Sequence, residues 1–200
     1  MILNLNLIAV LVLILLPLAA ALAMDGNPSA RQPDSLLKVG DPAPDFKAYT
    51  DEGEVWNSSD RGDGILVVFF YPAAMTGGCT AQACSFRDNR TRLIELGADV
   101  VGVSGDEVSN LALFRRANNL NFPLLSDEDG SIAKAFGVPV REGGTITREV
   151  DGEEFVLTRN VTTARWTFII GKDGKIAYID SEVSAATDSQ SVIAALKEMQ

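Results

Sequence analysis

The run of apolar residues from Ile65 to Tyr71 constrains the fold more than any other stretch of the chain. Its side chains are β-branched, aliphatic or aromatic and do not alternate with polar ones, so both faces of the strand that they predict must be buried. Such a strand lies inside a sheet that is covered on both sides by helices. Residues 79–96 follow with apolar side chains at helical spacing and a stop at Gly97, which predicts a helix directly after the strand.

The strand–helix order recurs after Gly97. Residues 99–104 read as a second strand, residues 107–119 as a second helix, and residues 131–138 as a short third helix. The side chains expected on one side of the second helix are Val108, Leu111 and Ala112. Because a strand–helix–strand connection is normally parallel, the sequence predicts an α/β fold with a central β-sheet flanked by helices.

Three hairpins are expected besides these units, one of them a two-stranded excursion, and the central sheet should be mixed. Short strands at Phe46–Tyr49 and Val55–Asn57 predict an N-terminal β-hairpin extension. Residues 145–159 reverse at Asp151-Gly152, a dipeptide suited to a tight turn. A further hairpin over residues 165–180 leads to a last helix at 189–199.

Composition excludes several functions. The chain has no histidine, so Ser/His and Cys/His nucleophile pairs and imidazole-ligated metals are excluded. The formal net charge is −10, and we find no basic patch, so nucleic acid is not an expected partner. Two cysteines without histidine are too few for a zinc site, and neither a metal nor an organic cofactor is expected.

The first residues predict a separate leader. Residues 7–23 carry no charge and end in Ala21-Leu22-Ala23, a pattern typical of a secretory signal peptide, although the run is also close to the length of an uncleaved membrane anchor. Residues 24–38 read as a linker and residues 39–200 as the domain. We therefore expect an exported protein, periplasmic or secreted, that contacts a membrane only through its N-terminal segment if that segment is retained.

Both cysteines fall in one stretch at the start of the predicted helix. The amide groups and dipole of a helix N-terminus favour an anion, so Cys79 is placed where a thiolate is stabilised. Gly77 and Gly78 would let backbone amides approach a bound oxygen, and Thr76 could offer a hydroxyl, but these three residues also fit an ordinary glycine turn with a capping threonine.

Cys84 lies five residues after Cys79. On an intact helix such residues have Cα atoms roughly 8 to 9 Å apart, beyond the roughly 7 Å limit for a disulfide. A bond between them therefore requires the helix to open, which favours a reversible redox pair over a permanent structural staple.

The segment "YPAAMTGGCTAQAC" resembles the active-site segment of the peroxiredoxins, and its cysteine spacing is similar to the bacterioferritin-comigratory (BCP), atypical 2-Cys subgroup. The likeness extends through "VGDPAPDF", "VVGVSGDEVSNLALF" and "ARWTFIIGKDGKI". It implies a thioredoxin-like fold and a thiol peroxidase that reduces hydrogen peroxide and organic hydroperoxides.

The resemblance also implies roles for single residues. By this likeness Cys79 is the peroxidatic cysteine, Cys84 resolves it as an intramolecular disulfide, and Arg165 is the cation beside the thiolate. Pro72 shields the site, and Thr76 hydrogen-bonds the peroxide. The sequence departs from the subgroup at Gly77, where proline is common, and at Trp166, where a smaller residue is usual.

The implied partners are a peroxide and a thioredoxin-like dithiol reductant, acting on a monomer or weak dimer. Two alternatives stay open at this point. An exported thiol–disulfide oxidoreductase could use the same fold, although such enzymes usually carry their cysteines two residues apart. A non-enzymatic binding domain could use the two cysteines only as a staple.

Overall fold

The apolar run forms β3 (Ile65–Phe70), an interior strand of a seven-stranded sheet. The computed structural model describes residues 36–200. Every residue of β3 is buried, as the absence of polar alternation predicts. β3 pairs in parallel with β4 (Ala98–Ser104) and antiparallel with β8 (Trp166–Ile170), so the sheet is mixed.

The full strand order is β2-β1-β5-β4-β3-β8-β9. β1 (Lys47–Thr50) and β2 (Val55–Asn57) form the predicted N-terminal hairpin, followed by the short 3-10 helix η1 (Ser58–Arg61). The remaining strands of the sheet are β5 (Leu124–Ser126) and β9 (Ile176–Asp180). The expected α/β architecture, a central mixed sheet flanked by helices, is therefore confirmed.

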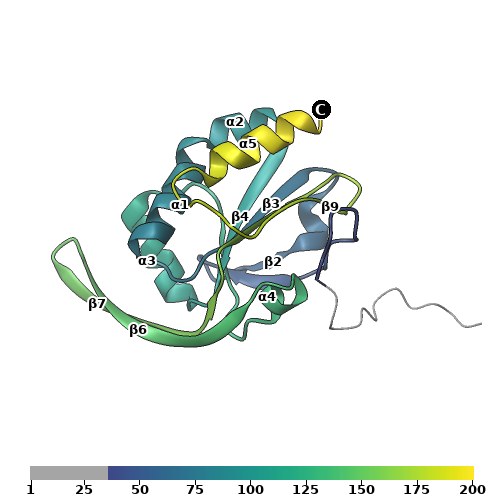
Figure 1. The fold of residues 1–200 in the computed structure, drawn as a ribbon. Coiled ribbons are helices and arrows are strands. Elements are labelled where there is room, and N and C mark those ends of the chain that lie inside the picture. Colours follow the sequence, from purple (N-terminus) through teal and green to yellow (C-terminus); the bar gives the residue numbers. More distant parts are fainter. Residues whose placement is uncertain (1–35) are drawn as a thin grey trace, which may run out of the picture. The chain divides into compact units, whose positions relative to one another are not determined.

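Alternate side chains of β3 enter two separate cores. Ile65, Val67 and Phe69 face the helices α1 (Gly77–Asp88), α2 (Arg90–Glu95), α3 (Val108–Asn118) and α5 (Asp188–Glu198). On this side Phe69 stacks on Phe86 with ring centroids 4.6 Å apart. Leu66, Val68 and Phe70 face the opposite side, where the N-terminal hairpin and Phe136, directly after α4 (Ser131–Ala135), cover the sheet. Figure 1 shows α1, α2 and α5 together above the sheet and α4 below it.

The helix predicted at 79–96 is two helices, α1 (Gly77–Asp88) and α2 (Arg90–Glu95). The break lies at Asn89, whose side-chain amide donates to the carbonyl of Ser85 and to Oγ of Ser189, both at 3.0 Å. An asparagine that binds neighbouring groups in this way competes with the helical ladder. Gly97, with φ +77°, ends the segment as predicted.

The second predicted helix is α3 (Val108–Asn118), but its buried face differs from the prediction. Leu111 is buried as expected, Val108 is only half-buried, and Ala112 is exposed. Leu113 and Phe114 are buried instead. Phe114 lies in the core between the helices and the sheet, whereas Leu113 packs against a second element beside α3. The last two helices are α4 (Ser131–Ala135) and α5 (Asp188–Glu198).

That second element is a long β-hairpin, β6 (Val140–Val150) and β7 (Glu153–Thr163). It reverses at Asp151-Gly152 as predicted, but each strand is several residues longer than expected. The two strands form a sheet of their own, and Figure 1 shows them as a curved arm beside α3.

Candidate active site

Cys79 is the third residue of α1, just past the carboxyl end of β3. The residue before the helix, Thr76, has extended backbone angles, and the first turn of α1 contains no acidic side chain. The first-turn amides and the helix dipole therefore act on the sulfur without a competing carboxylate in that turn. Cys79 is only 1% exposed, whereas Gly77 and Gly78 beside it are less buried.

Arg165 donates from Nη2 to Sγ of Cys79 at 3.4 Å. It lies immediately before β8, and because Trp166 of β8 pairs with Phe70 at the end of β3, this register brings Arg165 to the edge of the sheet where α1 begins. A Cβ atom at Gly78 would lie 3.2 Å from Nη2 of Arg165, closer than side chains normally approach. Glycine at position 78 thus leaves room for the cation.

The guanidinium of Arg165 is itself held by a buried network. Its Nη1 donates to Oε1 of Gln82, one turn after Cys79 on α1. Nε2 of Gln82 donates at 2.7 Å to Oδ2 of Asp188, the first residue of α5. Thr167 donates to the same oxygen at 2.8 Å.

Asp188 sets the orientation of this network. Its side chain is 1% exposed, and burial is the main reason that its pKa is raised from 3.8 to about 6, against the two hydrogen bonds that lower it. A carboxylate can accept hydrogen bonds but cannot donate them, so Asp188 binds the NH₂ group of Gln82. The other end of the same side chain, Oε1 of Gln82, therefore faces Arg165. Gln82 and Asp188 are residues that the sequence analysis missed.

The loop before α1 is fixed by a second buried carboxylate, that of Asp106. Its Oδ2 accepts from the amide of Ala74 at 2.8 Å and from Oγ of Ser104 at 2.9 Å. Burial raises the pKa of Asp106. Burial likewise raises the pKa of the neighbouring Tyr71 well above its usual value, because removal from water disfavours the charged form of each.

For two of the predicted site residues, Thr76 and Pro72, the described part of the chain shows no hydrogen bond to the sulfur of Cys79. The hydroxyl of Thr76 donates to the carbonyl of Ala73 at 2.9 Å and does not cap α1. Pro72 is half-buried directly after β3 and Tyr71. The structure thus brings the guanidinium of Arg165 to the sulfur of Cys79, while the expected roles of the site residues stay predictions.

Cys84 is half-buried on the same uninterrupted helix as Cys79, and both are free thiols. On such an intact helix, residues five positions apart are too far from each other to form a disulfide.

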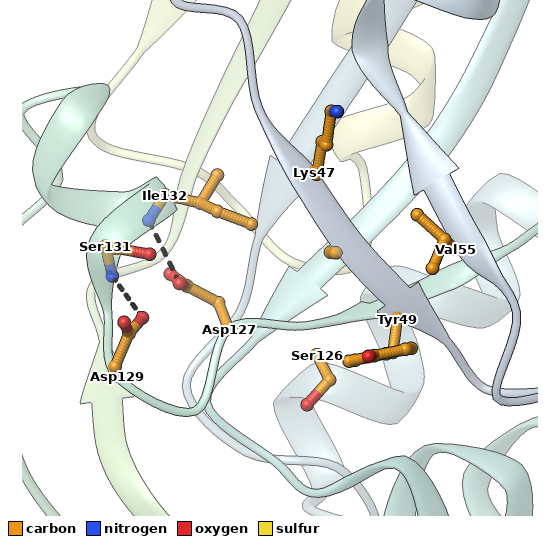
Figure 2. A pocket seen from close by; sticks show the side chains of 9 residues that line it. Lys47, Tyr49, Val55, Ser126, Asp127, Asp129, Ser131 and Ile132 are labelled. Carbon is orange, nitrogen blue, oxygen red and sulfur yellow. Dashed lines mark hydrogen bonds between the residues drawn. The ribbon is translucent and has the colours of Figure 1, made fainter.

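A cavity of about 310 Å³ lies elsewhere, between β1 and the start of α4. Figure 2 shows that its two acidic side chains already have partners: Asp127 accepts from the amide of Ile132 at 3.0 Å, and Asp129 from that of Ser131 at 2.9 Å. Neither cysteine lines this cavity. Its carboxylates accept hydrogen bonds from amides at the start of α4.

Comparisons with known proteins agree with the resemblance found in the sequence. Residues 39–179 match the model of the AhpC/TSA family. Peroxiredoxin Bcp of Escherichia coli (strain K12) is 38% identical over 162 residues, which cover 81% of this chain and 97% of that protein. A putative peroxiredoxin of Mycobacterium tuberculosis (strain H37Rv) is 39% identical over 150 residues, 74% of this chain and 88% of that protein.

Solved structures of the same group superimpose on the chain. Peroxidoxin BcpB from Mycobacterium tuberculosis matches with a TM-score of 0.68 at 36% identity, covering 82% of this chain and 99% of the other. The bacterioferritin comigratory protein of Xanthomonas campestris matches with a TM-score of 0.66 at 26% identity, covering 83% and 99%. These matches confirm the thioredoxin-like fold and do not favour the thiol–disulfide oxidoreductase alternative.

The relatives overturn the expectation of an exported protein. The match to the Escherichia coli relative takes in 97% of that protein, which leaves it no counterpart of the leader predicted at residues 1–23. On these comparisons the prediction of export is wrong. Among residues 36–200, no helix is both long and apolar enough to cross a membrane. The predicted signal peptide itself, and the predicted linker at 24–38 apart from its last residues, lie outside the described part of the chain.

Proposed function

Because the chain belongs to the AhpC/TSA family and its relatives are peroxiredoxins, we propose that it is a thiol peroxidase in which Cys79 attacks the peroxide. The observation that carries this proposal is the contact between Arg165 and Sγ of Cys79 at a helix N-terminus. A guanidinium and amide dipoles stabilise a thiolate, which is the nucleophilic form of cysteine.

In the first step the thiolate of Cys79 attacks one peroxide oxygen, and the O–O bond breaks. The sulfur becomes a sulfenic acid, and the other oxygen leaves as an alkoxide or hydroxide that takes up a proton. Arg165, the hydroxyl of Thr76 and the amides at Gly77 and Gly78 are the groups that would stabilise the charge on the leaving oxygen.

The burial of Cys79 limits what can reach it. Since Cys79 is 1% exposed while Gly77 and Gly78 are exposed, we propose that a peroxide reaches the sulfur beside these two glycines. The substrates proposed are hydrogen peroxide and organic hydroperoxides. Alkyl peroxide reduction is an activity of the Xanthomonas campestris bacterioferritin comigratory protein, which supports the second class.

In the second step Cys84 condenses with the sulfenic acid. An S–S bond forms, the S–O bond breaks and water leaves. Since both cysteines lie on α1, this step requires the first turns of the helix to open. A thioredoxin-like dithiol would then return both residues to thiols by exchange, and we propose that the protein acts as a monomer or weak dimer.

Peroxide consumption by the reduced protein tests the proposal. The unsubstituted protein should consume hydrogen peroxide with a dithiol as reductant, and Cys79→Ser should lose this activity. An insulin-reduction assay run beside it measures disulfide reduction, the activity of the alternative enzyme. Insulin reduction without peroxide consumption would overturn the assignment.

A further inference from the structure

The β6–β7 arm has no part in the proposed function, yet it reaches the loop before the peroxidatic helix. Nε of Arg148, on β6, donates to the carbonyl of Met75 at 2.8 Å. Met75 stands directly before Thr76, the residue that precedes α1. The arm, although 73 positions away from Met75 in the sequence at this contact, thus touches the segment that precedes Cys79.

Met75 has a backbone conformation that needs outside support. Its φ is +61°, in the left-handed region that residues other than glycine seldom adopt. Such a conformation persists only where the surroundings hold it. The side chain of Met75 packs against the small apolar cluster of Leu113, Val150 and Leu157, which joins α3 to the arm.

A second contact holds the other end of the same loop. The hydroxyl of Thr163, the last residue of β7, donates to the carbonyl of Tyr71 at 3.0 Å. The loop from Tyr71 to Met75 is therefore tied to the arm at both ends. Elsewhere the arm and α3 are not in close contact along their whole length. A groove of about 510 Å³, lined by Leu113 of α3 and Val156 of β7 among others, lies between them.

We propose that Arg148 is a positioning residue that keeps the loop before α1 closed, and so limits how often the oxidised Cys79 can meet Cys84. The inference rests on the proposed function, because it concerns the fate of the sulfenic acid formed there. Opening of the first turns of α1 must displace Met75, and the bond from Arg148 opposes that displacement. A bond between a charged donor and a carbonyl is stronger than a neutral one.

Two reactions compete for the sulfenic acid. In one, the thiol of Cys84 attacks it, and a disulfide and water form. In the other, the closed site admits a second peroxide, which transfers one oxygen to the sulfur to give a sulfinic acid and leaves as an alcohol or water. A residue that slows opening therefore shifts the balance toward the second reaction.

The test compares Arg148→Ala and Arg148→Lys with Arg141→Ala, which removes an exposed arginine from the same strand. Intact-mass spectrometry after increasing amounts of hydrogen peroxide measures the ratio of sulfinic acid to disulfide. We expect Arg148→Ala to lower this ratio by about 10- to 100-fold, the range that corresponds to the loss of one hydrogen bond from a charged donor. Arg148→Lys should give an intermediate ratio, and Arg141→Ala that of the unsubstituted protein.

Hydrogen exchange supplies a second readout. Amides of residues 76–84 should exchange faster in Arg148→Ala than in Arg141→Ala, while those of β3 should not. A ratio in Arg148→Ala equal to or above that in Arg141→Ala would overturn the proposal. If the alanine variant does not fold, the lysine variant decides in the same way. Failure of the proposed function would look different, since then the unsubstituted protein would form neither product.

Discussion

Replacing Asp188 with asparagine should change the pH dependence of stability in a direction fixed by its burial. The pKa of Asp188 is raised from 3.8 to about 6 in the folded protein, chiefly by desolvation. The folded state therefore binds this proton more tightly than the unfolded state. The protonated carboxyl of Asp188 therefore makes its whole contribution to stability below pH 3.8. This contribution is lost as the pH rises through about 6.

The size of the effect follows from the same shift. Between about pH 4.5 and about pH 7, a carboxyl with these two pKa values loses about 2 kcal/mol of its contribution to folding. An asparagine side chain cannot titrate, so the free energy of unfolding of Asp188→Asn, minus that of the unsubstituted protein, should increase by about 2 kcal/mol over this interval.

Urea unfolding followed by tryptophan fluorescence at the two pH values measures this difference. Asp63→Asn, at an exposed carboxylate, is the matched control and should show little change. A difference for Asp188→Asn that stays constant with pH would refute the reasoning, because it would mean that Asp188 titrates alike in the folded and unfolded states.

The remaining predictions concern the cation beside the sulfur. Arg165→Ala should slow Cys79 oxidation by about 10²- to 10³-fold, measured by stopped-flow peroxide reduction, and an unchanged rate would remove Arg165 from the site. Gly78→Ala should slow the same step by about 3- to 10-fold, since its Cβ would lie 3.2 Å from Nη2 of Arg165, while the helix gains up to about 1 kcal/mol of propensity. A faster or equal rate in this variant would show that the close approach is not needed. Asp188→Asn should also reduce peroxide more slowly, by about 3- to 10-fold, because a neutral amide that can donate as well as accept holds Gln82 less firmly with Oε1 toward Arg165. An undiminished rate would separate Asp188 from the cation.

Features encoded within short stretches could be predicted from the sequence. The burial of β3 follows from a run of apolar residues, and the turn at Asp151-Gly152 from a dipeptide that tolerates positive φ. The place of Cys79 in the first turn of α1 follows from the junction of the strand and helix patterns. The cation was found differently, through the family resemblance of the "ARWTF" segment.

Features that depend on distant contacts could not be predicted. The bond between Gln82 and Asp188 joins residues 106 positions apart, and no local pattern marks either partner. The break at Asn89 depends on Ser189, 100 positions away. The rotated buried face of α3 depends on Leu113 meeting the β6–β7 arm, an element whose packing against α3 the sequence analysis did not anticipate.

The central claim, that Cys79 is the sulfur oxidised by peroxide, is tested most directly by trapping its sulfenic acid. Cys84→Ser is treated with one equivalent of hydrogen peroxide in the presence of dimedone, and the labelled peptide is identified by mass spectrometry. The account predicts a dimedone adduct on Cys79 in Cys84→Ser, and a disulfide in place of the adduct when Cys84 is present. Absence of the adduct from Cys79, with the thiol recovered unmodified, would contradict it.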